Sequence, residues 1–148
     1  MIRSILSNHE IIAVFIVRVF LGMLFFFQGY DAIFRVGLKN ITDNYYPTLE
    51  RTGVSRSVTA WGVVFSSYVQ LIGGFLLILG FIKYYALCLL GINMVFTALV
   101  FGVTQPMWDL RAAFPRLVLL VFLLFVPWQW DVFSVDYFWS FFRFLRSF

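Results

Sequence analysis

Four long apolar segments, separated by shorter polar stretches, make up most of the chain. They cover about residues 11–34, 60–82, 84–101 and 112–130. As helices rising about 1.5 Å per residue, all four are long enough to cross the ~30 Å of hydrocarbon in a bilayer. The pattern predicts an all-α integral membrane protein, a four-transmembrane-helix bundle with short connections.

The polar stretches differ in length and content. Only the first connection, residues 35–59, is sizeable, and a short surface helix fits its composition. The second connection is a tight hairpin with Lys83 at its tip. The tail, residues 137–148, mixes aromatic residues with Arg143 and Arg146, which is typical of an interfacial helix in the headgroup plane. A fourth helix that continues past the membrane explains the tail equally well, and both interpretations stay open.

Composition agrees with a membrane protein. The chain is 62% hydrophobic and 12% charged, whereas soluble domains are about 45–50% apolar and about 25% charged. Its 148 residues leave no room for a separate soluble domain, so residues 1–148 are predicted to form a single membrane domain. The first apolar segment is too long for a secretory signal. Because the basic residues lie at the membrane edges, the net charge of +4 implies no nucleic-acid partner.

Basic residues give conflicting indications of orientation. Apart from Arg18, four basic residues lie on the side of the N-terminus and six lie on the other side, which favours an N-terminus outside. The basic aromatic tail favours the inside, because anionic cytoplasmic lipid attracts it. We expect a multi-pass protein of the bacterial cytoplasmic (inner) membrane with both termini inside.

Polar residues within the spans are the candidates for function. Arg18 lies seven residues into the first segment, where an unpaired arginine costs at least about 2.5 kcal/mol. If the helices alternate in direction, Arg18, Gln70 and Asn93 lie roughly 10, 18 and 13 Å from one surface. Thr97 follows Asn93 by one helical turn. We therefore expect Arg18, Gln70, Asn93 and Thr97 to form an intramembrane polar cluster.

Glycines accompany these polar residues on two of the predicted helices. Gly22 and Gly29 share a helix face with Arg18, and Gly73 and Gly74 lie on the side of Gln70. Small residues let neighbouring helix backbones approach closely. These four glycines are therefore predicted to be helix-packing positions.

Two interpretations of the polar cluster remain open. It is either a hydrogen-bonded staple that fixes the register of the helices, or a site for an anionic or quinone-like ligand or for a carboxylate from a partner subunit. The acids nearest the spans, Asp31 and Asp109, lie toward the opposite surface from Arg18. Arg18 is therefore expected to lack an internal counter-ion.

The sequence lacks the residues that several kinds of catalysis need. His9 is the only histidine and precedes the first span, so the chain has no haem or metal ligand set. Cys88 is the only cysteine, which excludes an internal dithiol pair. Phosphate-binding loops and nucleophile elbows are absent from the sequence. We expect no catalytic residue, no metal and no cofactor held within this chain, although contact with quinone or lipid stays open.

The sequence resembles the DoxX-like family of four-helix membrane proteins. Residues 18–22 (RVFLG), followed by Gln28 and Gly29, look like the family's first-helix signature. Residues 69–83 are similar to its E-L-x-G-G-x-L-L-x-x-G segment, and residues 91–94 to its third helix. Ser134 and Asp136 resemble its closing S-x-D motif.

Two positions depart from the family pattern. The glutamate of the second helix is Gln70 here, and the lysine after the second glycine falls on Ala32. If relatives use that glutamate for proton or ligand chemistry, the resemblance implies that this chain has lost it.

The resemblance also implies a class of function. Several DoxX-like proteins are associated with membrane oxidoreductases, including thiosulfate:quinone oxidoreductases.

Three hypotheses about the function of this chain follow. The first and preferred one is a non-catalytic accessory subunit that scaffolds or stabilises a larger membrane complex of the redox, quinone-linked kind. The second is a subunit that contributes to a quinone or thiosulfate-type site, and the third is a small stand-alone transporter or lipid-handling protein. Lipid and other membrane subunits are the expected partners, and the chain is not expected to be an enzyme on its own.

Overall fold

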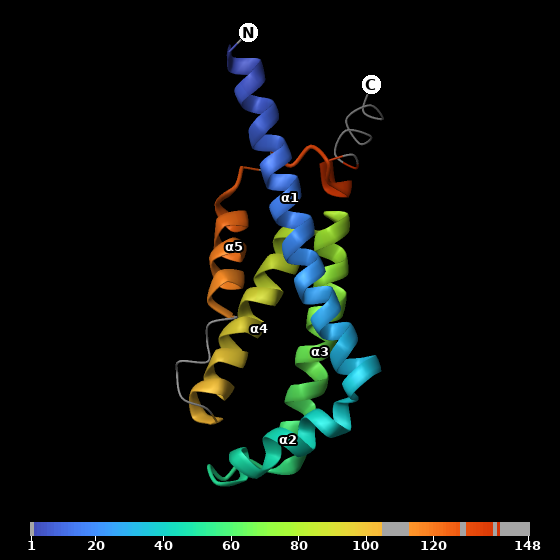
Figure 1. Ribbon diagram of the computed structural model, residues 1–148, viewed down its shortest axis with the longest axis vertical. Helices are drawn as coiled ribbons and strands as arrows, with labels where there is room; N and C mark the ends of the chain where they lie inside the picture. Colours follow the sequence, from blue (N-terminus) through green and yellow to red (C-terminus); the bar gives the residue numbers. More distant parts are fainter. Residues whose placement is uncertain (1, 105–112, 128–129, 138, 140–148) are drawn as a thin grey trace.

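The computed structural model describes residues 2–104, 113–127, 130–137 and 139 (Figure 1). Its elements are α1 (Ile2–Tyr30), the π-helix η1 (Asp31–Val36), α2 (Leu38–Glu50), α3 (Arg56–Leu79), α4 (Lys83–Thr104) and α5 (Ala113–Phe125). Every element assigned in the described ranges is a helix. The predicted all-α architecture is confirmed.

Three helical stretches are long and apolar enough to cross a membrane. They are His9–Val36, Arg56–Leu79 and Lys83–Val100. The described part of α5 has 13 apolar-rich residues and is about 20 Å long. Within the described residues the molecule is an all-α membrane bundle of three helices long enough to span the bilayer, with α5 as a fourth apolar helix.

The fourth helix ends earlier than expected, at Phe125 rather than near residue 130. Pro127 explains this end, because a proline disfavours the helical conformation of the residue before it, here Val126. The first connection is largely the helix α2, which agrees with the short surface helix that its composition allowed. The third connection at 105–112 and the tail beyond 139 lie outside the described residues.

Glycine allows α1 and α3 to lie in close antiparallel contact. A Cβ atom on Gly74 would come within 2.4 Å of the backbone nitrogen of Phe26, and one on Gly29 within 2.5 Å of that of Leu71. A Cβ atom on Gly22 would meet the backbone of the residues around Gly74 in the same way. Larger side chains at these positions would therefore force the two helices apart.

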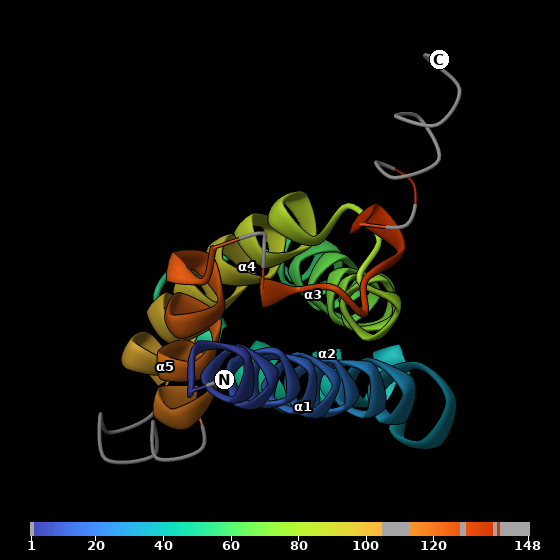
Figure 2. The same ribbon diagram turned by 90° about the horizontal axis from the view of Figure 1, so that it is seen from above.

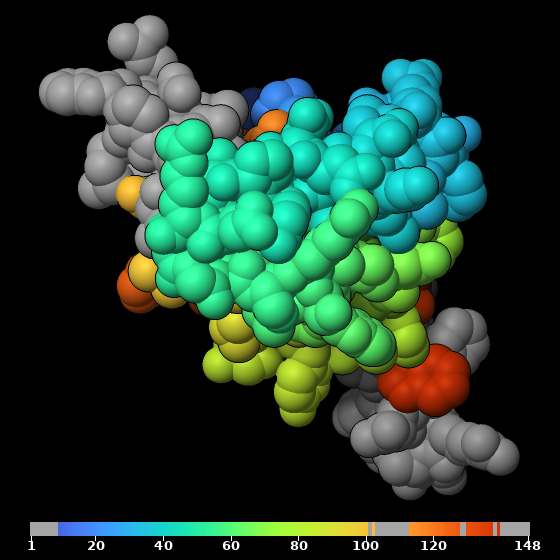
Figure 3. Space-filling view, turned by 90° about the horizontal axis from the view of Figure 1, so that it is seen from below, coloured from blue at the N-terminus to red at the C-terminus, as the bar shows by residue number. Residues whose placement is uncertain are grey.

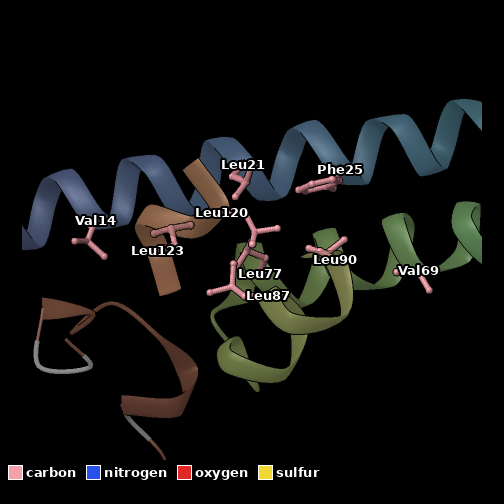
Figure 4. Packing of buried hydrophobic residues seen from close by; sticks show 9 residues of the cluster. All are labelled: Val14, Leu21, Phe25, Val69, Leu77, Leu87, Leu90, Leu120 and Leu123. Atoms are coloured by element: carbon pink, nitrogen blue, oxygen red, sulfur yellow. The ribbon is translucent and has the colours of Figure 1, made fainter. Parts of the chain in front are cut away.

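The apolar core lies between α1, α3, α4 and α5 (Figure 4). Leu21 and Phe25 of α1 face Leu77 of α3, with Leu87 and Leu90 of α4 beside them. The core residues are Val14, Leu21, Phe25, Val69, Leu77, Leu87, Leu90, Leu120 and Leu123. Gly73 belongs to this packing, since a Cβ atom there would lie 2.9 Å from Cγ of Leu90. Apolar burial thus holds all four helices together.

The helix α2 lies across one end of the bundle, below α3 and α4 (Figures 1 and 3). Arg56, the first residue of α3, pairs with Asp43 of α2 and lies over the ring of Tyr46. The chain segment that follows α5 lies at the opposite end of the bundle (Figures 1 and 2). The two ends of the bundle are therefore closed by different segments.

Candidate functional site

A short segment after α5 returns over the end of the bundle where α3 meets α4. We call this segment, residues 130–137, the C-terminal strap. Seen from above, it crosses between α1 and the α3–α4 turn (Figure 2). The ring of Phe133 contacts that of Phe15 on α1, with centroids 5.5 Å apart. The strap thus brings residues from near the end of the chain onto the first half of α1.

A buried ion cluster joins the strap to α1 and α4. The Nη1 atom of Arg18 lies 2.9 Å from Oδ1 of Asp131, and Nζ of Lys83 lies 2.9 Å from Oδ2 of the same carboxylate. The side chains of Arg18, Asp131 and Lys83 are 0%, 3% and 14% exposed. Arg18 also donates from Nη2 to the backbone carbonyl of Phe133 at 2.7 Å. Arg18 therefore has a carboxylate counter-ion inside the chain, and the expectation that it lacks one is wrong.

Asp136 caps the start of α4 from a distance of more than 50 residues along the chain. The backbone N–H groups of Ile82 and Lys83 donate to its two carboxylate oxygens, each at 2.9 Å. The first N–H groups of a helix have no partner within that helix, so an acceptor at this end stabilises it. The backbone N–H of Asp136 donates in turn to the carbonyl of Gly80 at 3.1 Å. The strap and the α3–α4 turn are therefore held together through both side chain and backbone.

The α3–α4 turn has the backbone shape that this contact requires. Phe81 N donates to the carbonyl of Leu76 and Gly80 N to that of Leu77, with Gly80 at φ +66°, which is a Schellman motif. Ile82 follows at φ +50°, which is rare for a β-branched residue. Its N–H is one of the two that Asp136 binds. Asp136 thus stabilises a backbone conformation that isoleucine seldom adopts.

Gly80 is needed for space as well as for backbone conformation. A Cβ atom there would lie within 2.8 Å of Cζ of Arg18 and 2.7 Å of Cβ of Ser134. The guanidinium group therefore lies directly against the bare Cα of Gly80. A side chain at this position would displace Arg18 from Asp131.

Ser134 shapes the strap itself. Its hydroxyl donates to the carbonyl of Asp131 at 2.7 Å and accepts from the backbone N–H of Tyr137 at 3.2 Å. These bonds close a turn that places Asp131 and Asp136 on the same side of the strap, facing α1 and α4. Of the two residues singled out as a motif in the sequence, Ser134 therefore shapes the strap and Asp136 joins it to the start of α4.

Among the described residues, the formal charges in and beside the ion cluster balance. Arg18 and Lys83 both pair with Asp131, and Asp136, which accepts from backbone N–H groups nearby, carries the second negative charge. Burying an isolated charge is costly, whereas a buried pair with further hydrogen bonds offsets much of that cost. The balance of charge suits a structural fastening between the strap, α1 and α4. It leaves no net charge with which to bind an anionic ligand.

Gln70 and Asn93 lie away from Arg18. Arg18 meets α3 at Gly80, ten residues from Gln70, which is about 15 Å along a helix. Asn93 is likewise ten residues, about 15 Å, from Lys83 on α4. Gln70 donates to Ser66 at 3.2 Å, and the hydroxyl of Thr97 donates to the backbone carbonyl of Asn93 at 2.8 Å. The single polar cluster expected from the sequence is therefore two separate regions.

The second region is a neutral polar layer beyond the apolar core. We call it the amide layer; its members are Ser66, Ser67, Gln70, Asn93 and Thr97. Leu90 of α4 meets Gly73 of α3, and Phe96 of α4 meets Gly62. Asn93, between Leu90 and Phe96, therefore lies at the level of Ser66 to Gln70. Gln70 and Asn93 lie at about the same depth, and Arg18 lies at a different one. The sequence-based depths of roughly 10, 18 and 13 Å for Arg18, Gln70 and Asn93 placed Asn93 too close to Arg18.

Asp131, Lys83 and the carbonyl of Phe133 are the members of the ion cluster that sequence reasoning missed. Asp131 lies beyond the fourth apolar segment and was not counted among the acids near the spans. The signal was present nonetheless. With four alternating spans, the end of the fourth segment, the hairpin at Lys83 and the start of the first segment all lie on one side of the membrane. That rule places Asp131 and Lys83 on the same side as Arg18.

A sequence model of the DoxX family matches residues 13–103, which is more than half of the 148-residue chain. The chain therefore belongs to the DoxX family. The matched region includes Arg18, Gly80, Lys83 and the amide layer, and it ends before the strap. No curated protein and no solved structure matches the chain.

Proposed function

We propose that this chain is a non-catalytic accessory subunit that scaffolds or stabilises a larger bacterial membrane complex of the redox, quinone-linked kind. The observation that carries the proposal is the environment of Arg18. This side chain is fully buried and neutralised within the chain by Asp131. The charge of Arg18 therefore stabilises the fold of the subunit and is not free to bind a ligand. This is the behaviour expected of a structural subunit.

The outer surface supports a role in assembly. Large aromatic side chains point away from the bundle on several helices, among them Trp61 (75% exposed) and Phe125 (83%). Phe114, at 67%, lies at the other end of α5 from Phe125. Aromatic residues are enriched where proteins pack against one another. The short helix α5 thus offers an aromatic flank to a neighbouring subunit.

Membership of the DoxX family supports the redox part of the proposal by resemblance only. Several members of that family are associated with membrane oxidoreductases. The alternative in which Arg18, Gln70 and Asn93 face one quinone or thiosulfate ligand is not supported by the geometry, because Arg18 lies about 15 Å from the level of the two amides.

The direct test is purification of the tagged protein from its native membrane in mild detergent. Co-eluting proteins are identified by mass spectrometry, and haem, flavin or copper is detected by the visible spectrum. Stoichiometric partners with redox centres are the expected result. Partners without redox centres would restrict the proposal to scaffolding. A protein that elutes alone would overturn it in favour of a stand-alone transporter or lipid-handling role.

A substitution separates scaffolding from participation in chemistry. We expect Asp131→Asn to lower the amount of assembled complex while the turnover of each assembled complex stays unchanged. Asp43→Asn is the matched control, because Asp43 also pairs with an arginine but lies on the exposed surface of α2. Full assembly with reduced turnover in Asp131→Asn would contradict a purely structural role.

A further inference from the structure

The amide layer contains a buried polar side chain that has no partner among the described residues. Asn93 is 1% exposed, and neither its Nδ2 nor its Oδ1 forms a hydrogen bond within that part of the chain. The nearby Thr97 hydroxyl is committed to the backbone carbonyl of Asn93 and not to its side chain. A buried amide therefore presents an unused donor and an unused acceptor to the interior of the bundle.

Gln70 does not complete this arrangement. It lies at the level of Asn93 on the facing helix, but its amide donates to Ser66 on its own helix at 3.2 Å. Both amides are nearly enclosed, with Gln70 7% exposed. Gln70 therefore forms its hydrogen bond within α3, and it does not satisfy the amide of Asn93.

The missing partner must be neutral and must both donate and accept. An unsatisfied buried polar group costs roughly 1–3 kcal/mol, and more where the surroundings are hydrocarbon. Among the buried residues of the described chain the charged ones are Arg18 and Asp131, both about 15 Å away in the ion cluster. An ion beside Asn93 would therefore have no counter-charge. A hydroxyl group has one donor and spare acceptor capacity, which matches the primary amide.

We infer that the amide layer is a binding site for a neutral hydroxyl group, held between Asn93 and the polar face of α3. The hydroxyl belongs either to a buried water or to the headgroup of an amphiphile that enters from the membrane. Both sources present the same chemistry to Asn93, and ordered water commonly satisfies buried amides. This inference goes beyond the proposed accessory role and does not depend on it.

The test uses the full chain in detergent and a matched pair of probes. 1-Decanol carries a hydroxyl on an alkyl chain, and decane is the same chain without it. A ligand that binds the folded state raises the melting temperature. For an amphiphile site we expect decanol to raise the melting temperature above the value in decane. This difference should vanish in Asn93→Leu. It should persist in Thr42→Val, because Thr42 is a buried threonine of α2 outside the amide layer whose hydroxyl donates to the backbone carbonyl of Leu38.

The water arm is measured by nuclear magnetic resonance on protein labelled with 15N-asparagine. For a water site we expect a cross-peak between water and the Asn93 side-chain amide, assigned by its loss in Asn93→Leu. A higher melting temperature in decanol than in decane identifies an amphiphile as the ligand. A cross-peak without that difference in melting temperature identifies water, and either result supports the site. Wild-type protein with neither signal overturns the inference. A double-mutant cycle of Asn93→Leu and Gln70→Leu can also overturn it. If each single variant loses the same free energy of unfolding and the double variant loses no more than either, the two amides bind each other and no ligand is needed.

Discussion

The bundle buries polar side chains in two regions that differ in how completely they are satisfied. In the ion cluster, charges of opposite sign meet at 2.9 Å, and the strap supplies further hydrogen bonds. In the amide layer, a neutral side chain is equally buried but has both of its polar atoms unpaired. The contrast teaches that burial alone does not define a site. In the ion cluster each charge has a partner of opposite sign, although Nε of Arg18 forms no hydrogen bond within the described residues. In the amide layer neither polar atom of Asn93 has a partner among those residues, and this is the region that we propose as a ligand site.

The largest expected effect comes from breaking the ion cluster at its shared carboxylate. Asp131→Asn leaves Arg18 and Lys83 without the carboxylate that pairs with both of them. Removing one member of a buried ion pair costs about 3–5 kcal/mol, and we expect a loss of that size in the free energy of unfolding, measured by denaturant titration in detergent. The exposed control Asp43→Asn should cost no more than about 1 kcal/mol. Equal losses in the two variants would show that burial adds nothing to the pair.

A smaller loss is expected from Gly80→Ala. The left-handed backbone at Gly80 costs alanine about 1–2 kcal/mol, and the clash with Arg18 adds about 1–3 kcal/mol. Gly53→Ala is the matched control. Gly53 has a similar φ of +82°, but a Cβ atom added there would meet nothing within 4 Å. The difference in melting temperature between the two variants therefore measures the contact with Arg18. If they lose the same amount, that contact is not tight.

The remote cap of α4 is expected to matter less. Asp136→Ala removes the acceptor for Ile82 and Lys83 and should cost about 1–2 kcal/mol, as loss of a helix cap does. Hydrogen exchange at the start of α4 should rise in this variant. Ser55→Ala, which removes the local cap of α3, is the comparison. No change in exchange at Ile82 and Lys83 would contradict the capping role of the strap.

The amide layer should give the smallest effect on stability. In Asn93→Leu an apolar side chain of similar size replaces a polar one that has no protein partner, so we expect a change in the free energy of unfolding near zero or slightly stabilising. The measurement is the same denaturant titration with Thr97→Val as control. A loss above about 1 kcal/mol would mean that Asn93 already has a partner within the protein. The two buried regions would then no longer differ.

Sequence reasoning reached the helices and the family but not the ion cluster. Long apolar runs determine where membrane helices form, and glycine spacing indicated the faces where α1 and α3 meet. The partner of Arg18 depends on the path that the chain takes after Pro127. This path cannot be predicted from the spacing of hydrophobic residues, because the strap is not a long apolar helix. The depth of Gln70 relative to Arg18 was misjudged for a related reason. The register of two antiparallel helices is set by contacts such as Gly80 with Arg18, and a count of residues from the ends of the apolar segments does not resolve it.

The remote cap also has a consequence for biosynthesis. A chain is made from its N-terminus, so α1, α3 and α4 leave the ribosome before the strap. Until then Arg18 and Lys83 have no counter-charge from Asp131, and the start of α4 lacks the carboxylate of Asp136. During synthesis the first span therefore carries an arginine that Asp131 does not yet neutralise. The strap, made near the end of synthesis, later supplies the counter-ion for this first helix.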